Sequence, residues 1–242
     1  MLKNTITIDG MQQHRKLRLI SPLIAILLCA FTCCVAQTLD RIKAGEEGRE
    51  RIERSSAVVA ALGLKKGDSV ADVGAGYGYF TNLLSKEVGP QGRVYAIDIA
   101  SSAIHALEER VTEDHLVNAV VIRGEIDNPK LPPSALNAVL IVDSYHEMVD
   151  HEAMLLHIME ALKPSGCIVI LEHCDESRLG EPREKLVRRH ELAPSIAEVE
   201  IKEAGFRTIE TTYPFVRSRQ GLPRPYGVGT TSWLIKATKP MR

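Results

Sequence analysis

This chain of 242 residues has almost no net charge, few cysteines and no internal repeats. Lysine and arginine number 30 against 31 acids, and the two signs are interspersed, so no basic face is available to grip nucleic acid. Of five cysteines, only Cys167 and Cys174 lie beyond residue 36. They bracket one predicted strand, roughly 23 Å apart, which is too far for a disulfide, so we expect two free thiols.

No repeat or low-complexity tract indicates a solenoid or a disordered chain. The length and 45% hydrophobic content suit one sizeable core.

The amino terminus differs in character from the rest. A basic stretch at residues 14–18 precedes an uncharged apolar run over residues 19–36. This pattern predicts a signal peptide over residues 1–36, cleaved between Ala36 and Gln37, or a membrane anchor if it is retained. Residues 37–242 would then form an exported domain, periplasmic or extracellular. A misassigned start codon would instead leave the domain in the cytoplasm.

The most informative stretch is Ser-Val-Ala-Asp-Val-Gly-Ala-Gly-Tyr-Gly at residues 69–78. It is typical of a buried strand that runs into a glycine turn and opens a helix, an arrangement that lets backbone approach a nucleotide closely. Dinucleotide sites use the spacing G-x-G-x-x-G, whereas here the third glycine, Gly78, comes one residue early. Asp72 also precedes the turn, and a carboxylate there suits a cationic amino-acid group better than a pyrophosphate.

With these residues the chain resembles the class I methyltransferases that use S-adenosylmethionine (SAM). Further motifs follow in the family's order from about residue 45 to residue 240. Asp98 ends the apolar run at residues 94–97, Gly124-Glu125 stands where the family usually has Gly-Asp, and residues 162–166 match the usual Leu-Lys-Pro-Gly-Gly with Ser165 for one glycine. The resemblance implies an α/β fold, a three-layer Rossmann-like sandwich around a mostly parallel seven-stranded sheet of order 3-2-1-4-5-7-6.

The same resemblance implies SAM as cofactor and a set of residues that border it. Asp98 is expected to accept hydrogen bonds from both ribose hydroxyls, and Gly124 and Glu125 to border the adenine. The full set of expected cofactor-binding residues is Asp72, Gly74, Ala75, Gly76, Tyr77, Gly78, Asp98, Ile99, Gly124, Glu125, Ile126 and Asp143.

Helical and extended patterns alternate after the targeting segment, which favours a parallel sheet covered on both faces. We expect a leading helix over residues 48–62 and further helices over residues 79–88, 101–114, 151–162 and 194–204. The last two strands are expected at residues 208–213 and 231–238. A loop rich in glycine, proline and arginine, residues 215–229, should join them.

Methyl transfer is an in-line displacement, and an acceptor that must lose a proton benefits from a positioned base. The candidate is His146, on the loop after the fourth strand, with Tyr145 and Glu147 as weaker alternatives. A capping or backbone-bonded histidine remains the other interpretation of His146.

No metal site is expected. His146 and His151 are five residues apart and would not share a helix face. The run His173-Cys174-Asp175-Glu176 is equally explained as a solvated strand end.

Three functions stay open at this point. The first is methyl transfer from SAM to a small-molecule acceptor, in the broad group that includes quinone-biosynthesis methyltransferases. The second is an exported SAM-binding domain without catalysis. The third, a nicotinamide-dependent oxidoreductase, is disfavoured by Asp72 and by the early Gly78.

Overall fold

The computed structural model describes residues 43, 44, 46, 48–217 and 230–241 of the chain. The predicted targeting segment lies outside the described residues, and so does most of the predicted loop, from residue 218 to residue 229. Within the described part, no helix is both long and apolar enough to cross a bilayer.

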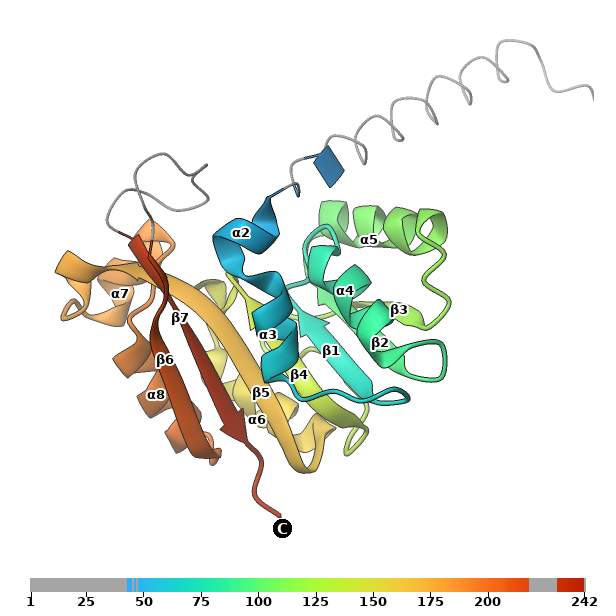
Figure 1. The fold of residues 1–242 in the computed structure, drawn as a ribbon. Coiled ribbons are helices and arrows are strands. Elements are labelled where there is room, and N and C mark those ends of the chain that lie inside the picture. Colours follow the sequence, from blue (N-terminus) through green and yellow to red (C-terminus); the bar gives the residue numbers. More distant parts are fainter. Residues whose placement is uncertain (1–42, 45, 47, 218–229, 242) are drawn as a thin grey trace, which may run out of the picture. The chain divides into compact units, whose positions relative to one another are not determined.

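Seven strands form one sheet in the order β3-β2-β1-β4-β5-β7-β6 (Figure 1). Strands β1 to β5 pair in parallel, β7 runs antiparallel to β5, and β6 runs antiparallel to β7. This confirms the predicted fold class and strand order. The strands are β1 Ser69–Val73, β2 Arg93–Asp98, β3 Ala119–Arg123, β4 Leu136–Val142, β5 Leu162–Asp175, β6 Arg207–Arg217 and β7 Thr230–Thr238.

Helices cover both faces of the sheet, with α3, α4 and α5 on one face and α6 and α8 on the other (Figure 1). Successive side chains of a strand point to opposite faces, so β4 serves both layers. Its Leu140 belongs to the cluster that contains Leu84 of α4, whereas its neighbours Val139 and Ile141 pack in the cluster that contains Ile158 of α6. The helices are α2 Arg49–Glu53, α3 Ser55–Ala61, α4 Tyr79–Val88, α5 Ser101–Glu113, α6 His151–Ala161, α7 Arg183–Leu186 and α8 Pro194–Glu203.

The predicted leading helix over residues 48–62 is wrong in one respect, because it is two helices. Arg54, between α2 and α3, has φ +54° in the left-handed region, which breaks the helical run. The break is held by a serine: the backbone N–H and the hydroxyl of Ser56 both donate to Oε2 of Glu50, at 2.8 and 2.9 Å. Such local side-chain bonds offer the backbone an alternative to a continuous helix.

Strand β5 begins earlier than the family turn at residues 162–166 suggests. Leu162 already pairs with Leu136 of β4, and a register shift follows before Cys167 pairs with Ala138. Ser165 has φ +64°, a conformation that favours glycine, the residue usual there in the family. Cys167 and Cys174 on β5 are both buried and free, which confirms the predicted thiols.

The parallel strands point their carboxyl ends to one edge of the sheet. In α/β sheets of this kind ligands bind at that edge, near the point where the strand order reverses. Here the reversal lies between β1 and β4, so the edge after β1, β2 and β4 is where a site is expected.

Candidate functional site

The glycine turn after β1 is shaped by backbone conformations that only glycine adopts readily. Gly74, Gly76 and Gly78 have φ values of +76°, +54° and +79°. Gly74 also has no room for a side chain, because an added Cβ would overlap the hydroxyl of Ser144 in the loop after β4. The turn is thereby brought directly against the end of β4.

Asp98 joins this turn to the end of β2. Its Oδ2 accepts a hydrogen bond from the backbone N–H of Gly76 at 3.0 Å, and its Oδ1 accepts one from Ala100 at 2.9 Å. A carboxylate offers about four acceptor sites, so both oxygens can still accept a ligand's hydroxyl hydrogens. Asp98 is thus in direct contact with the glycine turn, although the two are about twenty residues apart in the sequence.

Asp72 lies deeper than a direct ligand contact requires. Its side chain is 2% exposed, and the hydroxyl of Thr81 donates to its Oδ2 at 2.6 Å. Burial raises the pKa of Asp72 to about 6, against the opposing effects of the Thr81 hydrogen bond and the charge of Arg49. Asp72 therefore supports the turn from beneath, and a direct role toward the cofactor stays a prediction.

A cavity of about 270 Å³ opens at this edge of the sheet. Seven of the predicted cofactor residues line it, whereas Asp72, Ala75, Tyr77, Gly78 and Gly124 do not. The seven are Gly74, Gly76, Asp98, Ile99, Glu125, Ile126 and Asp143. The lining is completed by residues that the sequence did not single out as cofactor contacts: Val73, Ile97, Ser144, Glu147, Met148 and Met154.

The lining suits an adenosine. Ile99 and Ile126 are exposed apolar side chains on the cavity wall, at 53% and 56%, of the kind that pack against a planar base. Asp98 stands between them and the glycine turn in the sequence, with acceptor capacity for hydroxyl groups. The residues present therefore fit SAM at the base, the ribose and the close backbone approach.

Asp143 directly follows β4 and has a conformation that a non-glycine residue rarely takes, with φ +51°. Its Oδ1 lies 3.0 Å from Nδ1 of His173 on β5. Residues held in this region cluster at functional sites, where the surroundings fix them. Here the consequence is that Asp143 lines the cavity while remaining tied to the neighbouring strand.

His146 lies in the short 3₁₀ helix η1, Tyr145–Glu147, and is 4% exposed. Both oxygens of Glu172, on β5, lie close to its Nδ1, at 3.1 and 2.9 Å, and Glu172 also accepts the backbone N–H of His146 at 3.1 Å. Burial opposes protonation of the ring, but the hydrogen bond and charge of Glu172 outweigh it and raise the pKa of His146 above its usual value. His146 does not line the cavity; its neighbour Glu147 does.

The weaker base candidate Tyr145 is engaged elsewhere. Its hydroxyl donates to Oε2 of Glu200 at 2.8 Å, and burial raises its pKa further above the ordinary value. A phenol with a raised pKa is a poor base at neutral pH.

In neither of the two histidine-containing stretches considered as metal sites from the sequence, residues 146–151 and 173–176, do the side chains come together around one point. Asp150 caps α6 by accepting the N–H of Ala153, and His151 pairs with Glu200 instead of approaching His146. Cys174 packs in a small apolar cluster with Leu186 and Ala193.

Sequence reasoning missed two functional neighbours. Glu172 is an acid inside the apolar strand β5, and an acid in such a run was a signal that it had a buried partner. His190 belongs to the charged stretch after α7 and carried no comparable signal, because only the fold brings it to Glu147.

Comparison with known proteins gives a consistent result. Residues 64–211 match the profile of a methyltransferase domain. The demethylmenaquinone methyltransferase of a Geobacillus species is 26% identical over 141 residues, 58% of this chain and 60% of that protein. A ubiquinone/menaquinone biosynthesis C-methyltransferase of Neisseria meningitidis is 29% identical over 109 residues, 45% and 44% of the two chains. This chain thus spans at most about three fifths of these relatives.

Among solved structures, a SAM-dependent methyltransferase from Aquifex aeolicus is similar with a TM-score of 0.64 and 25% identity. The match covers 83% of this chain and 98% of that one. The likeness therefore extends over nearly the whole of a protein described as SAM-dependent.

Proposed function

Because this chain belongs to the methyltransferase domain family, we propose that it transfers a methyl group from SAM to a small-molecule acceptor. The observation that carries the proposal is the cavity at the carboxyl edge of the sheet. It is bordered both by the glycine turn with Asp98 and by the loop after β4 with Glu147 and Met148. One cavity thus reaches from the cofactor residues to the segment that would meet an acceptor.

The protein's task in this reaction is mainly to position. SAM supplies a methyl group on a sulfonium, and the acceptor must approach it in line while water is excluded. Asp98 holds the cofactor end through hydroxyl hydrogen bonds, and the turn at Gly74 allows close approach. Apolar side chains of Met148 and Met154 restrict water on the acceptor side.

On the acceptor side, we assign His146 to help the acceptor lose its proton. The ring is oriented by Glu172, which binds Nδ1 and leaves Nε2 directed toward Glu147. A carboxylate that fixes one ring nitrogen sets the tautomer and the direction of the other, as in other histidines that move protons or bind ions.

A small molecule fits this site better than a macromolecule. The cavity of about 270 Å³ is near the lower end of small-ligand pockets. The net charge of −1 gives no support for a nucleic-acid acceptor. The names of the relatives, which concern quinone biosynthesis, make quinone-like compounds the first acceptors to try.

We further propose that the domain is exported, with residues 1–36 as a cleaved signal or a retained anchor. The support is the basic stretch and the apolar run in the sequence. Mass spectrometry of the protein from its native cell fractions tests this. A new amino terminus at Gln37, or membrane recovery of the intact chain, would agree, and an intact soluble cytoplasmic protein would contradict it.

The activity is tested with methyl-labelled SAM and the small-molecule fraction of the source cells. Label should pass to a small molecule with the wild-type protein, and more slowly with Asp98→Ala when SAM is below saturation. Glu108→Gln, a change on the exposed face of α5, serves as the matched control and should behave as wild type. SAM binding without transfer to any compound in that fraction would favour the non-catalytic domain.

A further inference from the structure

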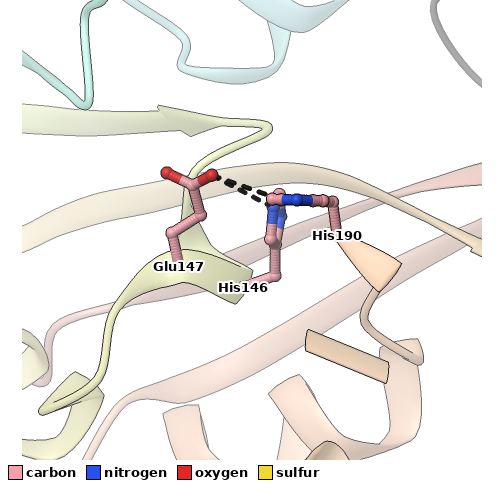
Figure 2. A group of neighbouring side chains, drawn as sticks. All are labelled: His146, Glu147 and His190. Atoms are coloured by element: carbon pink, nitrogen blue, oxygen red, sulfur yellow. Dashed lines mark ion pairs between the residues drawn. The ribbon is translucent and has the colours of Figure 1, made fainter. Parts of the chain in front are cut away.

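Three side chains beside the cavity point their polar atoms toward one another: His146, Glu147 and His190. His146 and Glu147 lie in η1, and His190 follows the 3₁₀ helix η3, Val187–Arg189. Figure 2 shows the carboxylate of Glu147 directed at both imidazole rings. Oε1 of Glu147 lies 3.8 Å from Nε2 of His146 and 3.4 Å from Nδ1 of His190, and the three atoms are all within 4.8 Å of one another.

The central atom of this group is a buried nitrogen without a hydrogen bond. His146 is 4% exposed, and its Nε2 has no hydrogen-bond partner among the described residues. Buried polar atoms are rarely left so, and each one calls for an explanation such as an ion. Because Glu172 takes the hydrogen of Nδ1, the neutral ring presents the lone pair of Nε2 toward Glu147 and His190.

We propose that His146 Nε2, Glu147 Oε1 and His190 Nδ1 bind a divalent transition-metal ion, with zinc as the type. Two imidazoles and one carboxylate are a donor set that zinc uses, whereas magnesium and calcium prefer oxygen alone. Ligand atoms around tetrahedral zinc lie roughly 3.3 Å apart, given bonds of about 2.0–2.1 Å. The separations of 3.4 and 3.8 Å from the Glu147 oxygen are close to this value, whereas the two imidazole nitrogens, within 4.8 Å of each other, must approach by up to about 1.5 Å.

Two of the three side chains are free to shift onto an ion, and the third is held in place. Glu147 and His190 have side chains 62% and 73% exposed, so both can move onto an ion. His146 is fixed by Glu172, which forms the carboxylate–histidine pair that commonly supports a metal ligand. A second group, Asp143, His146 and Glu172, is less suited, because Glu172 already binds Nδ1 and the backbone of His146.

Three protein ligands leave a position open on a zinc ion, as in catalytic sites. Glu147 also lines the cavity, so the ion lies at its edge. Resting on the proposed function, the open position takes the acceptor's oxygen or sulfur, whose proton leaves to solvent because the ion lowers its pKa. That atom then bonds to the methyl carbon as the carbon–sulfur bond of SAM breaks, which yields the methylated acceptor and S-adenosylhomocysteine. In this arrangement His146 helps the acceptor lose its proton by holding the ion, and does not accept the proton itself.

Metal binding by the full-length protein tests the proposal without any knowledge of the acceptor. Protein stripped with a chelator is titrated with Zn²⁺ against a chromophoric indicator, and with Mg²⁺ for comparison. Cysteines 29, 33 and 34 can also bind zinc, so the site is measured as the difference between wild type and variants. His190→Ala and Glu147→Gln should each bind zinc at this site at least tenfold more weakly, and His105→Ala, a histidine 61% exposed on α5, should match wild type.

Equal zinc binding by wild type, His190→Ala and Glu147→Gln would overturn the metal site, as would displacement of zinc by equimolar Mg²⁺. Both substituted side chains are exposed, so the variants should unfold at the wild-type urea concentration, which is checked in the same preparations. SAM binding is measured alongside by calorimetry. Loss of the zinc difference with SAM binding intact refutes the metal site alone, whereas absence of SAM binding refutes the proposed function and leaves the metal result standing.

Discussion

Replacing Asp72 with asparagine should make the protein more stable at neutral pH. The carboxyl group is 2% exposed, and burial raises its pKa from the ordinary 3.8 to about 6. At pH 8 the native protein therefore holds a buried negative charge. Asparagine keeps an oxygen that accepts the hydroxyl of Thr81 and carries no charge.

The magnitude follows from the difference between the two pKa values. A group whose pKa is raised on folding stabilises the native state below its unfolded pKa, and this contribution is lost as pH rises through the folded pKa. The loss amounts to about 3 kcal/mol at pH 8. At pH 5 roughly half of this is lost, and at pH 4 only a small part of it. The advantage of Asp72→Asn should therefore grow from pH 4 to pH 8.

Urea denaturation at pH 4, 5 and 8 measures this for wild type, Asp72→Asn and the surface control Glu108→Gln. The control should follow wild type at every pH, because Glu108 is exposed. A variant that is no more stable than wild type at pH 8, or whose advantage does not change with pH, would refute the reasoning. If Asp72 also attracts the cationic end of SAM, the more stable variant should bind SAM more weakly.

Three further outcomes are expected. Asp98→Ala should raise the Kd for SAM about tenfold or more in calorimetry, because a charged acceptor of hydroxyl hydrogens is worth about 1.5–3 kcal/mol per bond; an unchanged Kd would remove Asp98 from the site. Ser165→Gly should stabilise the protein by about 0.5–1 kcal/mol in urea, because Ser165 has φ +64°, and a destabilised variant would show that the serine side chain matters. Arg49→Met should destabilise the protein by about 1–3 kcal/mol, since it leaves Glu53, 6% exposed, without its ion pair. Adding Glu53→Gln should recover part of that loss, and no recovery would mean that Arg49 acts by packing alone.

The sheet could be predicted because its signals are local and strong. Strands β1, β2 and β4 are short, largely apolar runs that end at or just before a glycine or an acid, and α4 begins and ends where the pattern around Gly78 and Gly89 places it. The break at Arg54 could not be predicted in the same way. It depends on the hydrogen bond from Ser56 to the side chain of Glu50, and this bond interrupts a sequence pattern that otherwise predicts a continuous helix.

The residues of the candidate site also fall into those that a local motif predicts and those that only the fold brings together. Gly74 and Gly76 stand in one local motif, and the family resemblance places Asp98 beside them, so that their convergence on the cavity could be predicted. The group around His146 joins η1, β5 and the segment after η3, which are distant in the sequence. Only the register of β5 against β4 brings Glu172 under His146, and no local pattern encodes that contact.

Calorimetric titration of the purified full-length protein with SAM, and separately with NADH, tests the central claim most directly. The account predicts saturable binding of one SAM per chain, weakened by Asp98→Ala, and no binding of NADH. Tight binding of NADH with none of SAM would contradict it, and would assign the glycine turn and Asp98 to a nicotinamide cofactor instead.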